Sequence, residues 1–423
     1  MSDPVKGGFS PYQKFVAAIL AFLQFTVVLD FMILSPLGAQ LMPALQISPV
    51  QFGLLVSTYA FSAGVAGVLA AGFADRFDRK KLLLIFYAGF LAGTLLCGLA
   101  YSYHALLLGR LITGVFAGIV GSVSFAIVTD VFPLQMRGRV MGVIQTAFAA
   151  STVLGIPIGL LLATRWRWNA PFFLIVAVGV LVGWLIHARL RPVDEHLNRH
   201  PDRSPLHHLI MTVSNRFYLQ GFATTALLSV GGFMLGPFMS AFMVHNVGVT
   251  VPRLPLIYVL VGLFTVVAGP LIGRASDRFG KFNVFAVGSV VTVVMVVIFT
   301  HLGITPLWSL VAVLVILQVG IFSRIISSSA LTSALPAPPD RGAYMSISSS
   351  LQQVAGGIAA VLSGMIVSEG AGGVLLHYDY VGYVLIVTTL LTVWMMYFIN
   401  RKIGDGKSEQ EPPPMTIAVE DAG

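Results

Sequence analysis

The chain has 423 residues, of which 57% are hydrophobic and only 10% charged, and its mean hydropathy is +0.88. Soluble domains carry roughly 25% charged residues, so this composition excludes a soluble enzyme. The net charge of +8 could point to an acidic partner such as nucleic acid, but membrane proteins gather Lys and Arg on one side of the bilayer. The apolar runs are continuous rather than alternating, which also argues against a membrane β-barrel.

Hydropathy predicts twelve membrane-spanning helices in two groups of six. A span of about 20 apolar residues with a short connection makes a unit of roughly 35 residues, which divides this length into about twelve. The predicted spans are 15–35, 50–73, 82–101, 105–131, 140–163, 170–187, 217–244, 255–274, 283–301, 307–333, 345–367 and 381–399. We therefore expect an all-α polytopic membrane protein with a cytoplasmic tail at 1–14, a six-helix half at 15–187, a cytoplasmic linker at 188–215, a second half at 216–400 and a disordered cytoplasmic tail at 401–423.

The positions of Lys and Arg predict the orientation of these spans. With the N-terminus inside, 20 of the 25 basic residues fall in cytoplasmic segments, and only Arg165, Arg167 and Arg253 fall in outer loops. This asymmetry is the positive-inside pattern, and it explains the excess of positive charge without a nucleic-acid partner. We expect both termini in the cytoplasm of a protein that spans a bacterial inner membrane. The two remaining basic residues, Arg110 and Arg324, lie inside predicted spans.

No metal or cofactor is expected. The single cysteine, Cys97, lies in an apolar run as a small core residue, so a disulfide framework within the chain is excluded. Four histidines gather in the predicted linker, but no Cys or acidic ligand set accompanies them at finger-like spacing. They therefore favour a solvated linker over a metal site. These histidines are His196, His200, His207 and His208.

Asp30 is the one acidic residue well inside a predicted span. An Asp or Arg at the centre of a bilayer costs about 2.5–3.5 kcal/mol on insertion scales, so such residues usually face a partner or a cavity. At a rise of ~1.5 Å per residue, Asp30 and Arg110 both lie about 8 Å below the outer face. One interpretation is an ion pair that protonation of Asp30 would release, as proton coupling requires. The alternative is that Asp30 lies among outer headgroups and Arg110 extends toward them.

Other polar and aromatic residues inside the spans are candidates for a substrate cavity. Several repeat at helical spacing, such as Gln220 and Thr224 at i, i+4, but interhelical hydrogen bonds would give the same pattern. Arg324, near the inner face, could attract an anionic group or could anchor the end of its helix. A cavity with few charges suits a lipophilic or weakly polar solute. The candidates are Gln145, Thr152, Gln220, Thr224, Phe233, Tyr258, Arg324 and Gln352.

Two short motifs recur at nearly the same distance along the chain. Asp75–Phe77 recurs as Asp277–Phe279, 202 residues later, and Arg137–Gly138 recurs as Arg341–Gly342, 204 residues later. Two repeats at almost one offset indicate duplicated six-helix halves. In transporters, such halves pack about a pseudo-two-fold axis with the substrate between them.

The longer stretch around the first motif resembles the loop signature of the major facilitator superfamily. Ala71–Lys81 carries the first copy and Gly273–Lys281 the second, although Ala71 and Asp78 stand where the family usually has Gly. The resemblance implies a charge network that holds the halves together in one conformation and yields in the other. The basic residues alone could instead be only a topology signal. The implied switch residues are Asp75, Arg76, Arg79, Gly273, Asp277, Arg278 and Gly280.

Two further segments resemble one branch of that family. Arg110–Gly114 matches the Arg-x-x-x-Gly pattern that the family links to proton coupling. Gly155–Gly159, with Pro157 between its glycines, resembles a degenerate form of the segment typical of antiporters. Together with Asp30, the set resembles the drug:proton antiporter and sugar-efflux branch. The resemblance implies a transporter that exchanges protons for a small organic molecule by alternating access. We expect it to be a monomer.

Two other functions stay open. An uptake symporter or facilitator would share the loop signature, because importers and exporters both carry it. An integral membrane enzyme would need a buried nucleophile, base or metal cluster, and all nine histidines fall in predicted loops or at span ends. The enzyme is therefore the less favoured alternative.

Overall fold

The computed structural model describes residues 9–194, 211–336 and 340–408, and these ranges contain twelve helical segments long and apolar enough to cross a membrane. The prediction of twelve spans is confirmed. The first half comprises α1 (Pro11–Leu45), α2 (Pro49–Phe73), η1 (Ala74–Arg76), α3 (Arg79–Leu99), α4 (Tyr103–Val131), α5 (Leu134–Ala150), η2 (Ser151–Gly155), α6 (Ile156–Arg165) and α7 (Ala170–Arg189). The second comprises α9 (Arg216–Met234), α10 (Gly236–His245), η4 (Val251–Arg253), α11 (Leu254–Phe279), α12 (Lys281–Thr300), α13 (Leu307–Thr332), α14 (Arg341–Ile366), β1 (Ser368–Glu369), η6 (Ala371–Gly373), β2 (Leu375–Leu376) and α15 (Tyr378–Ser408).

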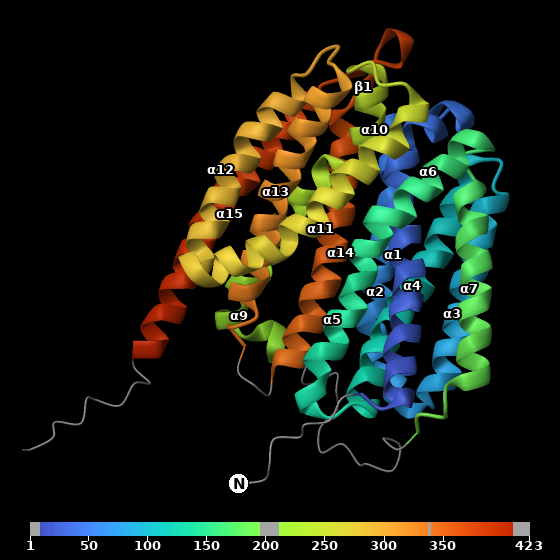
Figure 1. Ribbon diagram of the computed structural model, residues 1–423, viewed down its shortest axis with the longest axis vertical. Coiled ribbons are helices and arrows are strands. Elements are labelled where there is room, and N and C mark those ends of the chain that lie inside the picture. The colour runs from blue at the N-terminus through green and yellow to red at the C-terminus, as the bar shows by residue number, and fades with distance from the viewer. Residues whose placement is uncertain (1–8, 195–210, 337–339, 409–423) are drawn as a thin grey trace, which may run out of the picture.

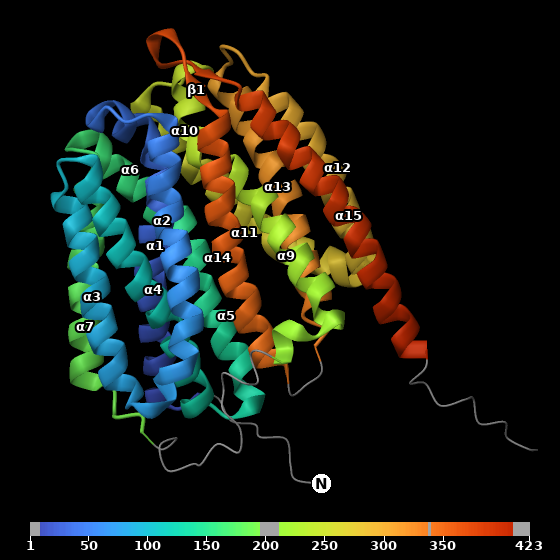
Figure 2. The ribbon, with the colours of Figure 1, turned by 180° about the vertical axis from the view of Figure 1, so that it is seen from behind.

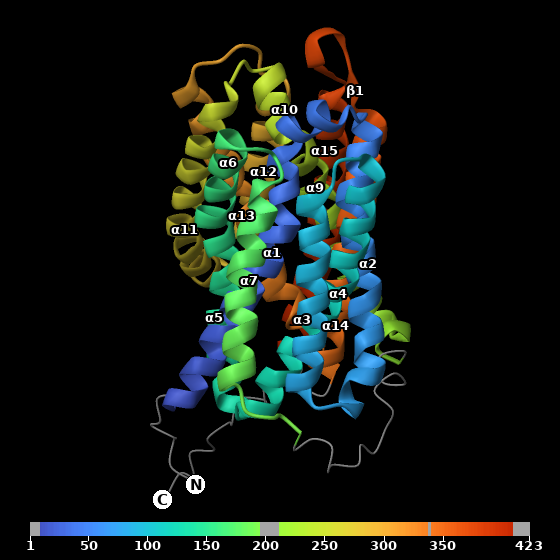
Figure 3. The same cartoon turned by 90° about the vertical axis from the view of Figure 1, so that its right-hand side faces the viewer.

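The bundle has two distinct ends (Figure 1). The short antiparallel pair β1–β2 lies at one, which we call the hairpin end. Helix α1 begins and α15 finishes at the other, which we call the terminal end. Figure 3 shows α1 between α5 and α7 on one side and α2, α3 and α4 on the other, so α1 is an inner helix of its half.

Helix α1 is much longer than its predicted span of 15–35. It begins at Pro11 because the Ser10 side chain and Gln13 form a capping box, and it ends where Gln46 adopts a left-handed conformation. Pro36 does not stop the helix, because membrane bundles tolerate proline where neighbouring helices pack closely. The Ser240 hydroxyl of α10 donates to the adjacent Ser35 carbonyl at 3.1 Å. At ~1.5 Å per residue, Asp30 therefore lies about 29 Å from the start of α1, close to its middle.

Two spans are interrupted rather than continuous. The fifth passes from α5 through the π-helical turn η2 into α6, and Pro157 lies in the first turn of α6. The seventh breaks at Leu235 between α9 and α10, with Pro237 in the first turn of α10. Proline lacks the N–H that would continue the hydrogen-bond ladder, so both breaks follow from the sequence.

The predicted tails and linker need correction where they can be compared. Residues 11–14 belong to α1 and not to an N-terminal tail, and α15 continues to Ser408, eight residues beyond the predicted end of the half. Residues 211–214 of the predicted linker are helical. The remaining parts of these segments, including the four linker histidines, lie outside the described residues.

The two halves meet closely through small residues toward the hairpin end. A Cβ on Gly38 of α1 would lie 3.3 Å from the Pro237 carbonyl, and one on Gly53 of α2 would lie 2.6 Å from the Ala360 carbonyl of α14. Helix α11 packs on η2 and α6, which belong to the hairpin side of the fifth span. Toward the terminal end, α12 and α15 lean away from the first half (Figures 1 and 2). The halves are therefore joined most tightly at the hairpin end.

Candidate functional site

Asp30 of α1 and Arg110 of α4 form an ion pair in the interior of the first half. Arg110 Nη1 lies 2.9 Å from Asp30 Oδ2, and both side chains are 0% exposed. The same nitrogen donates to the Asp30 backbone carbonyl at 3.1 Å. The sequence placed these two residues at a common depth, and the structure brings them into direct contact.

The ion pair leaves several polar atoms without a partner. Asp30 Oδ1 and the Nε and Nη2 of Arg110 accept or donate no hydrogen bond within the described ranges. The Thr94 hydroxyl lies beside the carboxylate but donates to the Phe90 carbonyl. Buried charges that are only partly satisfied are costly, so a change in the charge of either partner strongly alters the energy of this site.

The Arg110 guanidinium also stacks on an aromatic ring that sequence reasoning missed. Its Cζ lies 4.4 Å from the ring centroid of Tyr59 on α2. Gly114, one turn after Arg110, makes this approach possible, because a Cβ there would lie 2.6 Å from the Tyr59 carbonyl and would overlap the Ser62 hydroxyl. The Arg-x-x-x-Gly spacing therefore puts the cation and the helix contact on one face of α4.

The antiporter-like segment packs directly against the part of α1 that carries Asp30. A Cβ on Gly155 would lie 2.7 Å from Leu29, and one on Gly159 would lie 2.7 Å from Ile33. Gly155 is the last residue of the π-helical turn η2, and such turns often mark functional sites. Glycines at these two positions let α6 approach α1 on both sides of the buried carboxylate.

The first copy of the loop motif is tied into a buried network. Arg79 is 4% exposed, and its Nε lies 3.2 Å from Oδ2 of Asp130 at the end of α4. Asp78, which departs from the family pattern, caps α3: its Oδ1 accepts from the backbone of Lys80 at 2.8 Å and of Val193 at 3.2 Å. Arg76 is exposed. The backbone of Asp75 lies in η1, and its side chain is outside the described part of the chain.

The second copy is arranged differently. Asp277 and Arg278 are exposed at the end of α11, and the Arg278 guanidinium lies 5.4 Å from the Phe279 ring. Gly280 has a φ of +93°, which L side chains rarely adopt, so glycine is needed there to begin α12. Gly273 has open space around its Cα. The two copies therefore share a sequence but not a set of contacts.

The predicted cavity residues do not form one cluster. Thr152 donates to the Phe148 carbonyl and lies 3.9 Å from the Met32 sulfur, and Phe233 contacts Phe31, so these two lie near the ion pair. Gln220 accepts from Lys402 toward the terminal end. The positions of the remaining candidates are as follows: Thr224 is buried against the Gln220 carbonyl, Tyr258 packs on the main core, Gln352 is exposed on α14, and the side chain of Gln145 is outside the described residues.

Arg324 lies inside the second half, away from Asp30. It is 2% exposed, and its Nη2 donates to the Thr392 hydroxyl of α15 at 3.3 Å. No acidic residue lies within ion-pair distance of it in the ranges that the structure describes, and its Nε has no hydrogen-bond partner there. This contact joins α13 to α15 within the second half, eight residues before the end of α13.

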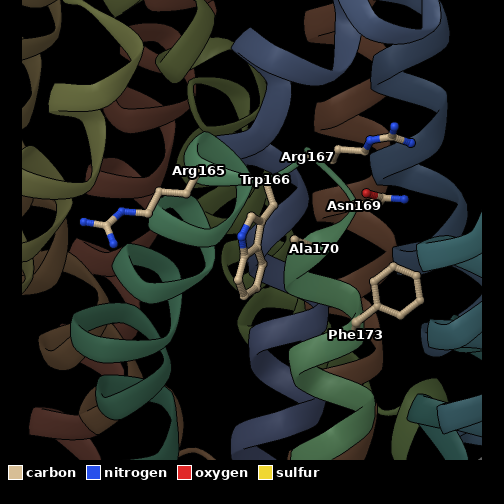
Figure 4. A pocket seen from close by; sticks show the side chains of 6 residues that line it. All are labelled: Arg165, Trp166, Arg167, Asn169, Ala170 and Phe173. Carbon is tan, nitrogen blue, oxygen red and sulfur yellow. The ribbon is translucent and has the colours of Figure 1, made fainter.

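A surface pocket of about 470 Å³ lies at the hairpin end of α6 and α7 (Figure 4). Two of the three predicted outer arginines, Arg165 and Arg167, point away from each other on either side of Trp166. Asn169 donates to the Gly98 carbonyl at 2.7 Å and so fixes this connection to α3. The pocket is remote from the ion pair, and its aromatic and basic lining is typical of a membrane–water boundary.

Comparison with known proteins agrees with this fold. The profile of the Major Facilitator Superfamily matches residues 20–233 and 221–420, which is nearly the whole chain. The chain belongs to this family. It is therefore a multi-pass secondary transporter with a small-molecule substrate, and its family is one of transporters, not enzymes.

Two of its curated relatives come from bacteria. The chain is 29% identical to the uncharacterized MFS-type transporter YceJ of Bacillus subtilis (strain 168) over 270 residues, which cover 63% of this chain and 68% of YceJ. It is also 29% identical to the multidrug resistance protein MdtL of Klebsiella pneumoniae (strain 342), over 43% of this chain and 46% of MdtL. The match to MdtL thus spans less than half of either protein.

Solved structures of the same fold extend over almost the entire chain. A bacterial homolog of the human lysosomal transporter Spinster, inward-facing and unoccupied, superposes with a TM-score of 0.70 at 16% identity, covering 96% of this chain and 100% of that one. The peptide transporter POT, in complex with alafosfalin, gives a TM-score of 0.73 at 13% identity and covers 94% and 97%. At these identities the likeness concerns the major facilitator fold alone.

Proposed function

We propose that this transporter is a proton-coupled exporter of small, largely apolar organic molecules, and that Asp30 carries the proton. One observation supports the proposal above all: a carboxylate and a guanidinium form a fully buried ion pair in the middle of a transporter half. A proton that binds Asp30 removes one charge of the pair, so protonation changes the electrostatics of the interior at a single atom group. Arg110 acts as the counter-charge.

Antiport follows if the solute and the proton use the same site in turn. Asp30 Oδ1 is buried and is not engaged by any described hydrogen-bond donor, so a cationic solute that reaches it when the halves move binds the ionised carboxylate more strongly than the neutral acid. Binding of a proton then disfavours the solute, and release of the proton favours it. The surroundings are mainly apolar, with Met32, Tyr59 and Phe233 nearby, which favours lipophilic solutes.

Separate observations support the export direction and the orientation in the membrane. Gly155 and Gly159 of the antiporter-like segment pack beside Asp30, and relatives include MdtL and multidrug resistance protein 3 of Bacillus subtilis (strain 168), both named for drug resistance. We place both termini in the cytoplasm of a bacterial inner membrane, because Arg165, Arg167 and Arg253 are the three basic residues assigned to outer loops. The halves close at the hairpin end, so the structure would then represent an inward-facing state of a monomer in the lipid bilayer.

The test is a solute-evoked change of internal pH in proteoliposomes. Purified protein is reconstituted and challenged with a panel that includes a lipophilic cation such as ethidium, a neutral sugar and a hydrophobic anion. We expect a lipophilic solute to evoke proton flux with the native protein and none with Asp30→Asn. Glu369→Gln is the matched control, because Glu369 is an exposed carboxylate on β1, outside both loop motifs, and it should retain the flux. Persistent solute-dependent proton flux in Asp30→Asn would overturn the proposal.

The direction of the proton relative to the solute separates the alternatives. Opposite movement in inverted vesicles supports antiport, movement in the same direction supports an uptake symporter, and solute movement without protons supports a facilitator. Each of the last two outcomes would replace the exporter in this proposal, while the assignment to a transporter family would stand.

A further inference from the structure

We propose that three aromatic side chains, Tyr59, Phe31 and Phe233, form a bridge that transmits the charge state of the Asp30–Arg110 pair to the second half of the transporter. We call these three residues the aromatic bridge. The inference rests on the proposed proton site at Asp30 and adds the residues that couple it to movement. Such residues are needed because Asp30 and Arg110 both belong to the first half, whereas alternating access requires the halves to move relative to each other.

The bridge begins at Arg110. The Tyr59 ring lies 4.4 Å from the guanidinium carbon, and the Tyr59 hydroxyl donates to the Val27 carbonyl of α1 at 3.4 Å. Tyr59 is 1% exposed, so water does not weaken this cation–π contact. Because two of the guanidinium nitrogens have no partner among the described residues, the ring is the main neighbour of Arg110 besides Asp30 itself.

Phe31 continues the bridge from the residue next to Asp30. Its ring centroid lies 5.3 Å from that of Tyr59, with an interplanar angle of 30°, and 5.9 Å from that of Phe233, with an angle of 59°. Both distances fall within the range of favourable aromatic pairs. Phe31 thus follows Asp30 directly in the chain. Its ring contacts Tyr59, which lies against Arg110, and Phe233, which belongs to the second half.

Phe233 receives the contact at a place where the second half is interrupted. It lies in the last turn of α9, two residues before the break at Leu235 that separates α9 from α10. On its other side, a Cβ on Gly356 of α14 would lie 3.0 Å from the Phe233 ring, so the ring has little room to move independently. A displacement of Phe31 is therefore passed to α14 and to the interrupted seventh span.

Protonation of Asp30 is what would displace the rings of the aromatic bridge. When Asp30 becomes neutral, Arg110 loses its counter-charge and keeps the Asp30 carbonyl and the Tyr59 ring as neighbours. The guanidinium, which already lies over the Tyr59 ring, is then drawn closer to the ring, and Tyr59 and Phe31 must adjust together because their rings touch. Packed rings transmit such a shift as a unit, since protein interiors have few voids to absorb it.

The experiment measures the distance between the two halves at the terminal end by electron–electron resonance of spin labels. Labels are attached at Arg189→Cys on α7 and Asn283→Cys on α12, both exposed, in a Cys97→Ala background that removes the one native cysteine. Across an acid-to-alkaline pH series, the native bridge should give a pH-dependent shift in the distance distribution. Phe31→Ala and Phe233→Ala should each lose most of that shift, and the double variant should lose no more than either single one.

Two variants separate coupling from loss of packing. Phe61→Ala is the matched control, because Phe61 lies on α2 and touches Gly357 of α14 across the same interface without belonging to the bridge. It should keep the shift. Phe31→Tyr preserves the ring and should restore the shift that Phe31→Ala loses. If Phe61→Ala removes the shift as fully as Phe31→Ala does, the bridge is wrong.

The Asp30→Asn variant distinguishes failure of the bridge from failure of the proposed function. If Asp30→Asn abolishes the shift while Phe31→Ala and Phe233→Ala keep it, the proton site stands and the bridge is overturned. If the native protein shows no shift, or if Asp30→Asn leaves it intact, the proton site itself fails and the bridge fails with it. Loss of the shift in Asp30→Asn and both bridge variants, but not in Phe61→Ala, supports both.

Discussion

Arg110 Nη1 lies 2.9 Å from the carboxylate and 3.1 Å from the backbone carbonyl of Asp30, so one nitrogen contacts both the side chain and the main chain of the same residue. The second contact does not depend on the charge of Asp30. A neutral Asp30 would therefore release the carboxylate while Arg110 remains attached to α1. This geometry allows repeated protonation without separation of α1 and α4.

The ion pair should behave as a unit in stability measurements. Arg110→Met or Asp30→Leu alone leaves one buried charge uncompensated, which typically costs about 3–5 kcal/mol of unfolding free energy. The double variant Asp30→Leu/Arg110→Met removes both charges and should be more stable than either single variant. Thermal unfolding in detergent checks this, and a double variant whose loss equals the sum of the single losses would contradict it. Transport should be absent in all three.

Arg324 should respond in the opposite direction. It is as deeply buried as Arg110, but among the described residues its partner is the Thr392 hydroxyl, which already donates to the Thr389 carbonyl. Arg324→Met removes a charge that costs about 2.5–3.5 kcal/mol inside a bilayer and leaves no opposite charge behind. We expect its melting temperature to equal or exceed that of the native protein, in contrast to Arg110→Met. A large loss of stability would mean that Arg324 is paired in the folded protein.

The two loop copies should differ in their sensitivity to substitution. Arg79 and Asp130 form a contact of 3.2 Å with Arg79 almost fully buried, whereas Asp277 and Arg278 are exposed. Asp130→Asn should therefore lower stability by about 1–3 kcal/mol, the usual penalty for an unsatisfied buried polar group, and Asp277→Asn should change it little. Unfolding midpoints of the two variants in the same detergent test this. Equal effects would show that the Arg79–Asp130 contact adds no stability beyond that of the exposed Asp277 carboxylate.

Gly114 should be intolerant of even a methyl group. A Cβ at Gly114 would lie 2.6 Å from the Tyr59 carbonyl, and backbone cannot move aside as a flexible side chain can. Gly114→Ala should cost about 1–3 kcal/mol through overpacking and should impair transport by displacing Tyr59 from Arg110. Gly121→Ala on the same helix is the matched control, because nothing lies within 4 Å of its Cβ position. Unfolding and proteoliposome transport of the pair should diverge, and similar behaviour would refute the close contact.

Much of the fold was accessible from hydropathy, because each span must bury about 20 apolar residues regardless of its neighbours. The number of spans, the duplication and the loop motifs were therefore predicted. The position at which α1 ends was not predicted. Pro36 and Gln40 look like the start of a loop, yet the helix continues to Leu45, and α1 packs on α10 of the second half. The sequence pattern of a single segment does not show how the two halves pack against each other.

The candidate site divides in the same way. A single buried carboxylate and a single arginine at one depth already pointed to Asp30 and Arg110. Tyr59, Phe31 and Asp130 received no role, since an aromatic residue in an apolar span or an acid at a span end is unremarkable in sequence. Arg324 and Gln220 were grouped as cavity residues by composition, yet they contact Thr392 and Lys402 at separate places. Helical spacing shows which residues share a face of one helix, but it does not show which neighbouring helix packs on that face.

The sequence by itself determined that this chain crosses a membrane, that it is built from two related halves, and that very few charges are left for chemistry, because the cost of burying charge restricts where each one can lie. Only the tertiary structure decided which of those charges meet. Asp30 and Arg110 are 80 residues apart, and the bundle brings them together while Gly114 lets α4 pack on α2 and Gly155 lets η2 pack on α1. Contact between distant segments depends on how helices pack, and that is a property of the whole bundle.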